Sequence, residues 1–229
     1  MAIKNYLSTQ QRVAKILLDI KAVTISPKKP YIFTSGIVSP IYTDNRLLMG
    51  HPLKRKEIIL YIAYLLKEKG IDPEVIAGTS TAGIAPAAFL SELLVLPMVY
   101  VRGEKKAHGK GKQVEGIMEK GSEVLLVEDL ISTGKSSLAA IDAIRSEGGK
   151  CNTCVAFIDY GLKDTAKKYK DLKVDLFTLT TFEVLVEMAE KLNLIAHKEK
   201  AVVLEWNKDP WGWGKKAHVA KEKEQSTDY

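Results

Sequence analysis

The chain combines two patterns of apolar residues, the spacing of amphipathic helices and the short continuous runs of buried strands. Helical spacing predicts an amphipathic helix over residues 8–21 and a longer one from Pro52 to Lys69, which Gly70 ends. The segments predicted after it are, in order, strand Val75–Ala77, helix Ile84–Leu94, strand Met98–Val101, strand Val124–Val127, helix Ser136–Glu147, strand Cys154–Ile158, helix Lys163–Lys170, strand Val174–Thr178 and helix Phe182–Leu192. Such alternation predicts an α/β fold whose central, mainly parallel sheet is flanked by helices on both faces.

The segment Val124–Ser137, VLLVEDLISTGKSS, is the most informative part of the sequence. Two carboxylates, Glu128 and Asp129, close its apolar strand, and a small polar loop leads from them into the next helix. In an α/β fold, ligands bind beyond the carboxyl ends of the strands. The backbone N–H groups of the loop and the helix start can bind an anion, and the carboxylates can accept hydrogen bonds from sugar hydroxyls. We therefore predict a ribose-phosphate site here.

Two other interpretations of this segment are open. Gly134-Lys135-Ser136 matches the end of a nucleotide-binding P-loop, but the first glycine of that motif would fall at Asp129, whose carboxylate would repel a triphosphate. The segment is also compatible with an ordinary buried strand and helix joined by a polar connection. The acidic pair favours the sugar-phosphate interpretation over the P-loop.

Length and composition favour one α/β domain that binds neither membrane nor nucleic acid. The 229 residues are 46% apolar, enough for one sizeable core, and no uninterrupted apolar stretch is long enough to span a membrane. The net charge of +6 lies mainly in residues 102–112 and from Lys208 onward, without a nucleic-acid-binding motif. The two cysteines, Cys151 and Cys154, predict a reducing, cytoplasmic location. Three apart on a predicted strand, they should face opposite sides of the sheet and form no metal or redox site.

Residues 102–112, called the cationic loop below, are a second candidate for chemistry. Five cations, one acid and three glycines fall within these eleven residues. A pliable loop dense in cations suits closure over a departing pyrophosphate, because it neutralises developing charge and excludes water. His108 adds a group that titrates near neutral pH. Alone, the run is equally compatible with a solvated surface loop; beside a sugar-phosphate site, the catalytic interpretation is favoured.

Four motifs together resemble those of the type I phosphoribosyltransferases, and in particular the orotate phosphoribosyltransferase family. They are Tyr31–Arg46 (YIFTSGIVSPIYTDNR), Gly78–Ala87 (GTSTAGIAPA), Val101–Gly116 (VRGEKKAHGKGKQVEG) and the acidic segment Val124–Ser137. The resemblance implies the type I phosphoribosyltransferase fold, with a small N-terminal hood segment and a flexible catalytic loop. It also implies transfer of the phosphoribosyl group of 5-phosphoribosyl 1-pyrophosphate (PRPP) to orotate, giving orotidine 5′-monophosphate and pyrophosphate in pyrimidine synthesis.

The resemblance further implies roles for individual residues. Catalytic roles fall to Arg102, Lys106, His108, Glu128 and Asp129. These five are expected to bind PRPP together with Leu130, Ile131, Ser132, Thr133, Gly134, Lys135 and Ser136. Orotate is expected at Ser132 and Arg46, although Arg46 could equally pair with Asp44. Mg²⁺ is expected to be held mainly through PRPP, without protein ligands of its own, and the cationic loop is expected to act across a homodimer.

Four positions depart from the pattern of part of the family. Thr34, Ala82, Gly103 and Tyr160 stand where other members carry basic residues, although the neighbouring sequence resembles a branch that lacks the lysines. Two rival functions are a phosphoribosyltransferase for uracil or a purine and a PRPP-sensing regulatory protein without catalysis. The run SGIVSPIYTDNR favours orotate over other bases. The residues before Tyr31 are too few for the DNA-binding module that a regulatory protein would need.

The predicted domain organisation is simple. Residues 1–195 are expected to form one phosphoribosyltransferase domain, whose residues 1–45 contain the N-terminal helix and the hood segment that faces the base. Residues 196–229 are expected to be a polar, Lys-rich extension, loosely packed from Trp206 onward.

Overall fold

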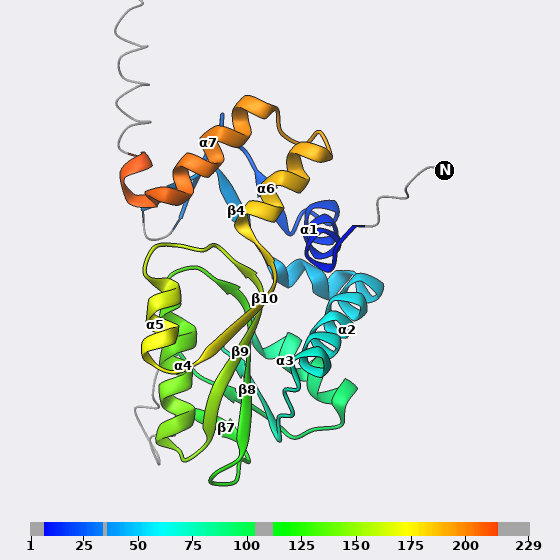
Figure 1. Ribbon diagram of the computed structural model, residues 1–229, viewed down its shortest axis with the longest axis vertical. Coiled ribbons are helices and arrows are strands. Elements are labelled where there is room, and N and C mark those ends of the chain that lie inside the picture. The colour runs from blue at the N-terminus through cyan, green and yellow to red at the C-terminus, as the bar shows by residue number, and fades with distance from the viewer. Residues whose placement is uncertain (1–6, 34–35, 104–111, 215–229) are drawn as a thin grey trace, which may run out of the picture.

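A six-stranded, mainly parallel sheet forms the centre of the molecule (Figure 1). The computed structural model describes residues 7–33, 36–103 and 112–214. The strands of this sheet are β5 (Val75–Thr79), β6 (Met98–Val101), β7 (Val114–Gly116), β8 (Glu123–Ile131), β9 (Lys150–Asp159) and β10 (Asp175–Thr181). Their order is β10-β9-β8-β5-β6-β7, and every neighbouring pair is parallel except β6 and β7. The predicted fold class is confirmed.

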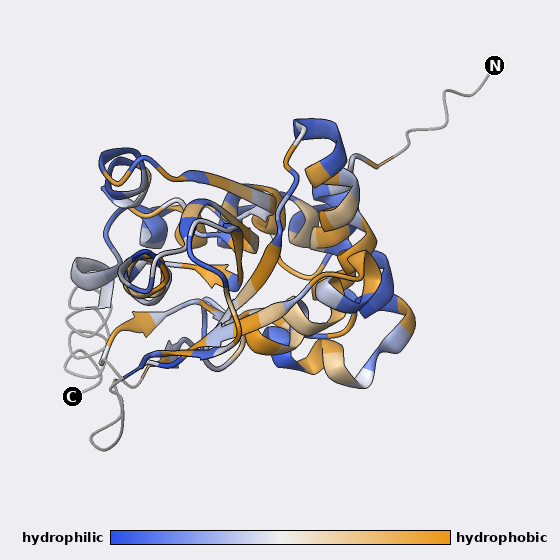
Figure 2. Cartoon of the chain, turned by 90° about the horizontal axis from the view of Figure 1, so that it is seen from below, coloured by the Kyte–Doolittle hydropathy of each residue, from blue (hydrophilic) through white to orange (hydrophobic). Residues whose placement is uncertain are grey.

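Helices cover both faces of this sheet. One face carries α4 (Lys135–Ser146) and α5 (Thr165–Asp171), and the other carries α1 (Thr9–Asp19), α2 (Pro52–Lys69), α3 (Ile84–Leu94) and α6 (Phe182–Lys191). Figure 2 shows apolar residues concentrated between these layers and polar residues on the outer surfaces of the helices. Within the described residues, no helix is both long enough and apolar enough to cross a membrane.

Local sequence signals explain where several helices begin and end. At the start of α1, Ser8 and Gln11 cap each other: Ser8 Oγ accepts from the Gln11 N–H at 3.2 Å, and Gln11 Oε1 accepts from the Ser8 N–H at 3.1 Å. Helix α2 has Pro52 at its first position and ends at Gly70, whose φ of 64° is readily adopted only by glycine. The predicted bounds of α2, α3 and β6 are confirmed.

The strand that carries the acidic pair is longer than predicted. β8 continues to Ile131, so Glu128 and Asp129 lie within the strand instead of closing it. The cause is pairing with β9, which persists to Ile131 opposite Asp159. The backbone that carries both carboxylates is therefore held in place by its pairing with β9.

The prediction that Cys151 and Cys154 face opposite sides of the sheet is wrong. Opposite Glu123 and Leu125 of β8, strand β9 contains one extra residue, and this bulge reverses the alternation of its side chains. Both thiols lie in the apolar layer beneath α4, where burial raises the pKa of Cys151 to about 12. The described residues include no cluster of three or more His, Cys, Asp or Glu suited to a metal ion.

The hood segment lies outside the central sheet. Its strands form two antiparallel pairs, β1 (Val23–Ile25) with β4 (Ile41–Thr43) and β2 (Tyr31–Ile32) with β3 (Val38–Ser39), and the 3-10 helix η1 (Asn45–Gly50) follows. A further helix, α7 (His197–Lys208), lies beside β4 and α6 (Figure 1). The prediction of loose packing from Trp206 onward is wrong for Trp206 itself, because its side chain is only 2% exposed. The domain boundary at residue 195 stays a prediction.

Candidate active site

A cavity of about 410 Å³ opens where β5, β6 and β8 end and α4 begins. Its lining contains many of the predicted site residues: Arg102, Leu130, Ser132, Thr133, Gly134, Lys135 and Ser136. Ile131, which lies between two of these residues in the sequence, is buried, at 1% exposure. Lys106 and His108 lie outside the described residues. The structure thus places most of the described members of the predicted set around one space.

The loop between β8 and α4 is oriented to present its N–H groups to this cavity. The carbonyl oxygens of Ser132, Thr133 and Gly134 all accept hydrogen bonds from side chains behind the loop. The donors are Thr165 Oγ1 (3.1 Å), Lys168 Nζ (3.4 Å) and Ser137 Oγ (3.0 Å), respectively. In a trans peptide the N–H points opposite to the C=O, so the N–H groups that follow the Ser132 and Thr133 carbonyls point away from α5, and the one that follows the Gly134 carbonyl points away from the body of α4. Together with the free N–H groups of the first turn of α4, they form a site for an anion.

Helix α5 also supports this loop through Tyr169, and the sequence analysis did not identify α5 as part of the site. Tyr169 donates or accepts a buried hydrogen bond of 2.6 Å with Ser137 Oγ, and burial raises the pKa of the Tyr169 hydroxyl. Gly134 has a φ of 73°, and a Cβ there would lie 3.2 Å from Tyr169 Cε2. The sequence does contain a pattern that indicates this support, because Thr165, Lys168 and Tyr169 share one face of a helix at i, i+3 and i+4.

The acidic pair lies behind the residues that line the cavity, with Glu128 next to Ser136 and Asp129 on the wall of a small second pocket. Glu128 is 4% exposed; its Oε1 accepts from the Asp129 N–H at 3.2 Å and its Oε2 from Ser136 Oγ at 3.4 Å. Burial, reinforced by the charge of Asp129, raises the pKa of Glu128 to about 8. Burial also raises the pKa of Asp129. The pair is therefore a poor place for two charges until a ligand donates hydrogen bonds to it.

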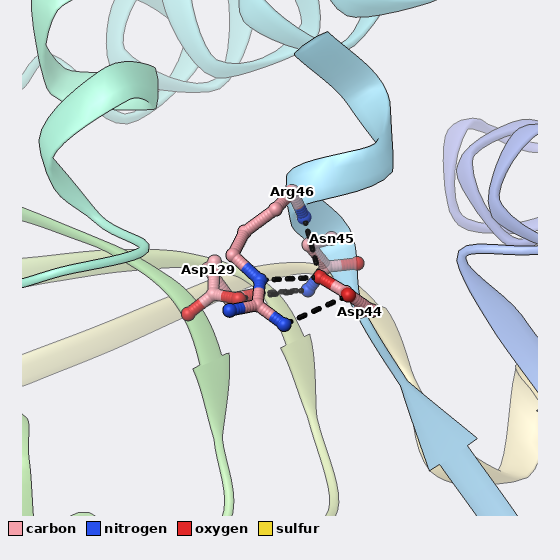
Figure 3. Close-up of polar contacts among 4 residues, drawn as sticks. All are labelled: Asp44, Asn45, Arg46 and Asp129. Atoms are coloured by element: carbon pink, nitrogen blue, oxygen red, sulfur yellow. Dashed lines mark hydrogen bonds and ion pairs between the residues drawn. The ribbon is translucent and has the colours of Figure 1, made fainter. Parts of the chain in front are cut away.

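Asn45 is a site residue that the sequence analysis did not identify. Figure 3 shows its amide reaching Asp129: Nδ2 donates to the Asp129 carbonyl oxygen at 3.0 Å and to Oδ2 at 3.4 Å. The Asn45 side chain is buried, and its hydrogen bond opposes the rise in the pKa of Asp129. Because these residues are 84 positions apart in the chain, no local pattern indicates the contact.

Of the two contacts considered for Arg46, with orotate and with Asp44, the structure contains the one with Asp44. Its Nε and Nη2 donate to Asp44 Oδ1 at 2.6 Å and Oδ2 at 2.8 Å, and this pairing raises the pKa of Arg46. The side chain is 64% exposed and lies beside Asp129 (Figure 3). The pairing with Asp44 is observed, and the contact with orotate stays a prediction.

The glycine-rich turn between β5 and α3 is explained first by packing. A Cβ on Gly83 would lie 2.6 Å from the Val127 carbonyl oxygen, and one on Gly78 would lie 2.8 Å from the Gly83 carbonyl oxygen. Only glycine therefore lets α3 approach the sheet this closely. The same turn brings Thr79 and Ser80 to the cavity wall.

The two ends of the cationic loop meet at the rim of the cavity. The Arg102 N–H donates to the Gln113 carbonyl oxygen at 3.0 Å, and Gln113 Nε2 donates to the Arg102 carbonyl oxygen at 2.7 Å. Glu147 at the end of α4 accepts from the N–H groups of Gln113 and Val114, at 3.2 and 3.1 Å. Arg102 Nη1 is 3.4 Å from Glu115 Oε1. The loop therefore begins and ends at a fixed neck facing the anion site.

The four departures from the family pattern lie in different places. Gly103 lines the cavity, with open space around its Cα, and Ala82 lines a small pocket beside Asp129. Tyr160 is buried, and its hydroxyl shares a hydrogen bond of 2.8 Å with Thr43 Oγ1. Thr34 lies outside the described residues.

The site therefore offers three chemically distinct regions within one small space. The loop at the start of α4 can bind a phosphate, the acidic pair can accept hydrogen bonds from a diol, and the neck of the cationic loop supplies a guanidinium. This spatial arrangement of the three regions fits a phosphorylated sugar that carries a second anionic group.

Comparisons with known proteins give independent support. The family model described as a phosphoribosyl transferase domain matches residues 50–191. The orotate phosphoribosyltransferase of Coxiella burnetii is 46% identical over 201 residues, covering 88% of this chain and 96% of its own. That of Listeria innocua is 45% identical over 209 residues, covering 91% of this chain and all of its own.

Solved structures agree with these sequence relatives. The crystal structure of orotate phosphoribosyltransferase from Aeropyrum pernix has a TM-score of 0.69 and 29% identity, covering 80% of this chain and 99% of its own. UMP synthase from Leishmania donovani has a TM-score of 0.74 and 26% identity over 87% of this chain, which spans 42% of that longer chain.

Proposed function

This chain belongs to the orotate phosphoribosyltransferase family, and on that premise we propose how its residues catalyse the reaction. The enzyme is a pentosyltransferase that transfers the phosphoribosyl group of PRPP to orotate, giving orotidine 5′-monophosphate and pyrophosphate. The observation that carries the residue assignment is the acidic pair, Glu128 buried and Asp129 half-buried, directly beside the loop that lines the cavity at the start of α4.

PRPP fits the three regions of the site in one orientation. The 5′-phosphate binds the N–H groups after Ser132 and at the start of α4. The ribose 2′- and 3′-hydroxyls donate to Glu128 and Asp129, with Asn45 holding Asp129 in place. The pyrophosphate then extends toward Arg102 and the turn at Thr79 and Ser80. The hydrogen bonds of the loop carbonyls support this placement. All three carbonyls accept from protein side chains, which leaves the N–H groups that follow them to bind the phosphate.

Catalysis in this arrangement is positioning and electrostatic stabilisation. The bond from C1′ to pyrophosphate breaks ahead of the bond from C1′ to N1 of orotate, so positive charge develops on the ribose ring. The acidic pair lies near that charge through the diol, and Arg102, Lys106 and His108 are assigned to the departing pyrophosphate. Each well-aimed group of this kind contributes roughly 2–4 kcal/mol to lowering the barrier.

Magnesium enters this scheme with the substrate. The described residues hold no cluster of three ligands that could form a metal site by themselves, so Mg²⁺ would be held mainly through PRPP, beside the carboxylates of Glu128, which is buried, and Asp129, which is half-buried. When bound, the ion neutralises charge on the leaving pyrophosphate. The protein contributes the anion loop and the acidic pair that orient this complex.

Orotate is assigned to the space between the hood segment and the anion loop. Ser132, on the cavity wall, and Arg46, on η1, are the proposed contacts. Arg46 would exchange one interaction with Asp44 for the orotate carboxylate, which accepts the same planar pair of donors.

We also propose that the enzyme is a cytoplasmic homodimer in which the cationic loop acts on the partner's site. A stripe of exposed apolar residues on α2, formed by Leu53, Leu60 and Tyr64, supports such an interface because exposed apolar stripes of this kind favour protein contacts. The free, buried Cys151 and Cys154 are consistent with a reducing compartment.

The experiment that tests the proposed reaction is a substrate panel. Purified protein is mixed with PRPP, Mg²⁺ and either orotate, uracil, adenine or hypoxanthine, and pyrophosphate release is measured. We expect release that requires all three components and occurs only with orotate. Release with another base and none with orotate would overturn the substrate, and PRPP binding without release for any base would indicate a regulatory protein.

A further inference from the structure

Helix α7 is tied to the hood segment by contacts that the reaction scheme does not use. Trp206 Nε1 donates to the Val38 carbonyl oxygen in β3 at 2.9 Å, across 168 positions of sequence. The chain then passes over the same residue, since a Cβ on Gly214 would lie 2.9 Å from Val38 Cβ. Lys28 Nζ, in the turn between β1 and β2, lies 3.2 Å from Glu199 Oε1 of α7.

A second tie runs from α7 to the end of β9. Asn207 Nδ2 donates to the Tyr160 carbonyl oxygen at 2.6 Å, and the Tyr160 hydroxyl shares a hydrogen bond of 2.8 Å with Thr43 at the end of β4. The Trp206 ring packs against Tyr160 and Phe182, with centroids 6.1 and 5.8 Å apart. Burial raises the pKa of Tyr160 to about 12, so its hydroxyl keeps its proton at neutral pH.

These ties converge on the part of the chain that contains the SGIVSPIYTDNR run. The hairpin β2–β3 contains Val38, the strand β4 contains Thr43, and η1 with Asn45 and Arg46 follows directly. Both the hood segment and α7 lie outside residues 50–191, the domain shared with other phosphoribosyltransferases. The PRPP-binding loop and the acidic pair, by contrast, lie within that domain and make none of these contacts with α7.

We propose that Trp206 is a positioning residue for the base. Through Val38 it fixes the hairpin β2–β3, and Asn207, through Tyr160 and Thr43, fixes strand β4. Together they hold the hood segment over the site of orotate. This inference rests on the proposed function. It extends the reaction scheme because it assigns specificity for the base to a helix beyond the shared domain. Its consequence is selective, since loosening α7 should weaken orotate binding and leave PRPP binding unchanged.

The test is steady-state kinetics of Trp206→Phe, which removes the indole N–H and keeps an aromatic ring. We expect KM for orotate to rise about three- to tenfold, the effect of one lost hydrogen bond, with KM for PRPP unchanged. Asn207→Ala, which cuts the tie to Tyr160, should act in the same direction. Trp211→Phe is the matched control, because Trp211 lies in the same terminal region and is 62% exposed.

Hydrogen exchange of the ligand-free protein gives a second readout that does not depend on turnover. The peptide covering residues 31–41 should exchange faster in Trp206→Phe than in the wild type, while the peptide covering residues 128–137 should not change. Equal rises in both KM values, or unchanged exchange and kinetics, would overturn the inference and leave the proposed function standing. Absence of turnover with orotate in the wild type would overturn both.

Discussion

Replacing Glu128 by glutamine should stabilise the ligand-free protein at alkaline pH. Burial and the charge of Asp129 raise the Glu128 pKa from 4.5 to about 8, so between these values the folded protein binds a proton that the unfolded chain has lost. The free energy of unfolding therefore falls as the pH rises across this window. The shift corresponds to an upper limit of roughly 4–5 kcal/mol. Because Asp129 shares the coupling, we expect the amide to recover about 2–4 kcal/mol above pH 8.

Urea unfolding between pH 5 and pH 9 measures this difference. Glu123→Gln is the control, because Glu123 lies at the exposed start of the same strand and pairs with Lys150 at 3.1 Å. The advantage of Glu128→Gln over the wild type should be small at pH 5 and grow steadily to pH 8, whereas the control should follow the wild-type curve. Parallel curves for Glu128→Gln and the wild type would refute the reasoning that burial holds a proton on this pair.

Three further predictions follow from other contacts. Gly83→Ala places a Cβ 2.6 Å from a backbone oxygen and should lower the free energy of unfolding by about 2–3 kcal/mol in urea titrations, whereas Gly50→Ala, with nothing within 4 Å, should not. Asn45→Ala leaves the buried carbonyl oxygen of Asp129 without its amide donor and should weaken PRPP binding roughly tenfold in calorimetry. If the cationic loop acts across a dimer, mixing inactive Lys106→Ala subunits with inactive Asp129→Asn subunits should restore about a quarter of wild-type activity.

Each of these has an outcome that would count against its premise. Equal stability of the two glycine variants would mean that the turn can relax without cost. A loss of PRPP affinity in Asn152→Ala as large as in Asn45→Ala would remove the special role of the Asp129 contact, because Asn152 is an exposed residue of β9. No recovery of activity on mixing, after confirmed subunit exchange, would place the loop over its own subunit's site.

Elements with their own local signals were predictable from the sequence. Pro52 and Gly70 delimit α2 by backbone chemistry that needs no neighbour, and the alternation of strands and helices defines the sheet. The strand β8 was predicted too short because its last residues owe their conformation to β9. The strands β1–β4, two or three residues long, are too short to show any periodicity.

The candidate site was predictable where its residues are neighbours in sequence and not where folding brings them together. Ser132–Ser136 and the acidic pair form one continuous segment. Asn45 reaches Asp129 only through the path of η1, and the chain that follows Trp206 is polar and rich in lysine. Trp206 is buried because Tyr160, directly after β9, and Phe182, at the start of α6, provide a partner surface that does not belong to its own helix.

The most direct test of the central claim is the rate of orotate consumption, followed by its ultraviolet absorbance with PRPP and Mg²⁺, in the wild type, Asp129→Asn and Asp142→Asn. Asp142 is an exposed residue of α4 and serves as the control. We expect turnover in the wild type and the control and a loss of at least about a hundredfold in Asp129→Asn, because a group that interacts with developing charge is removed. Undiminished turnover in Asp129→Asn would contradict the assignment of the acidic pair to the ribose.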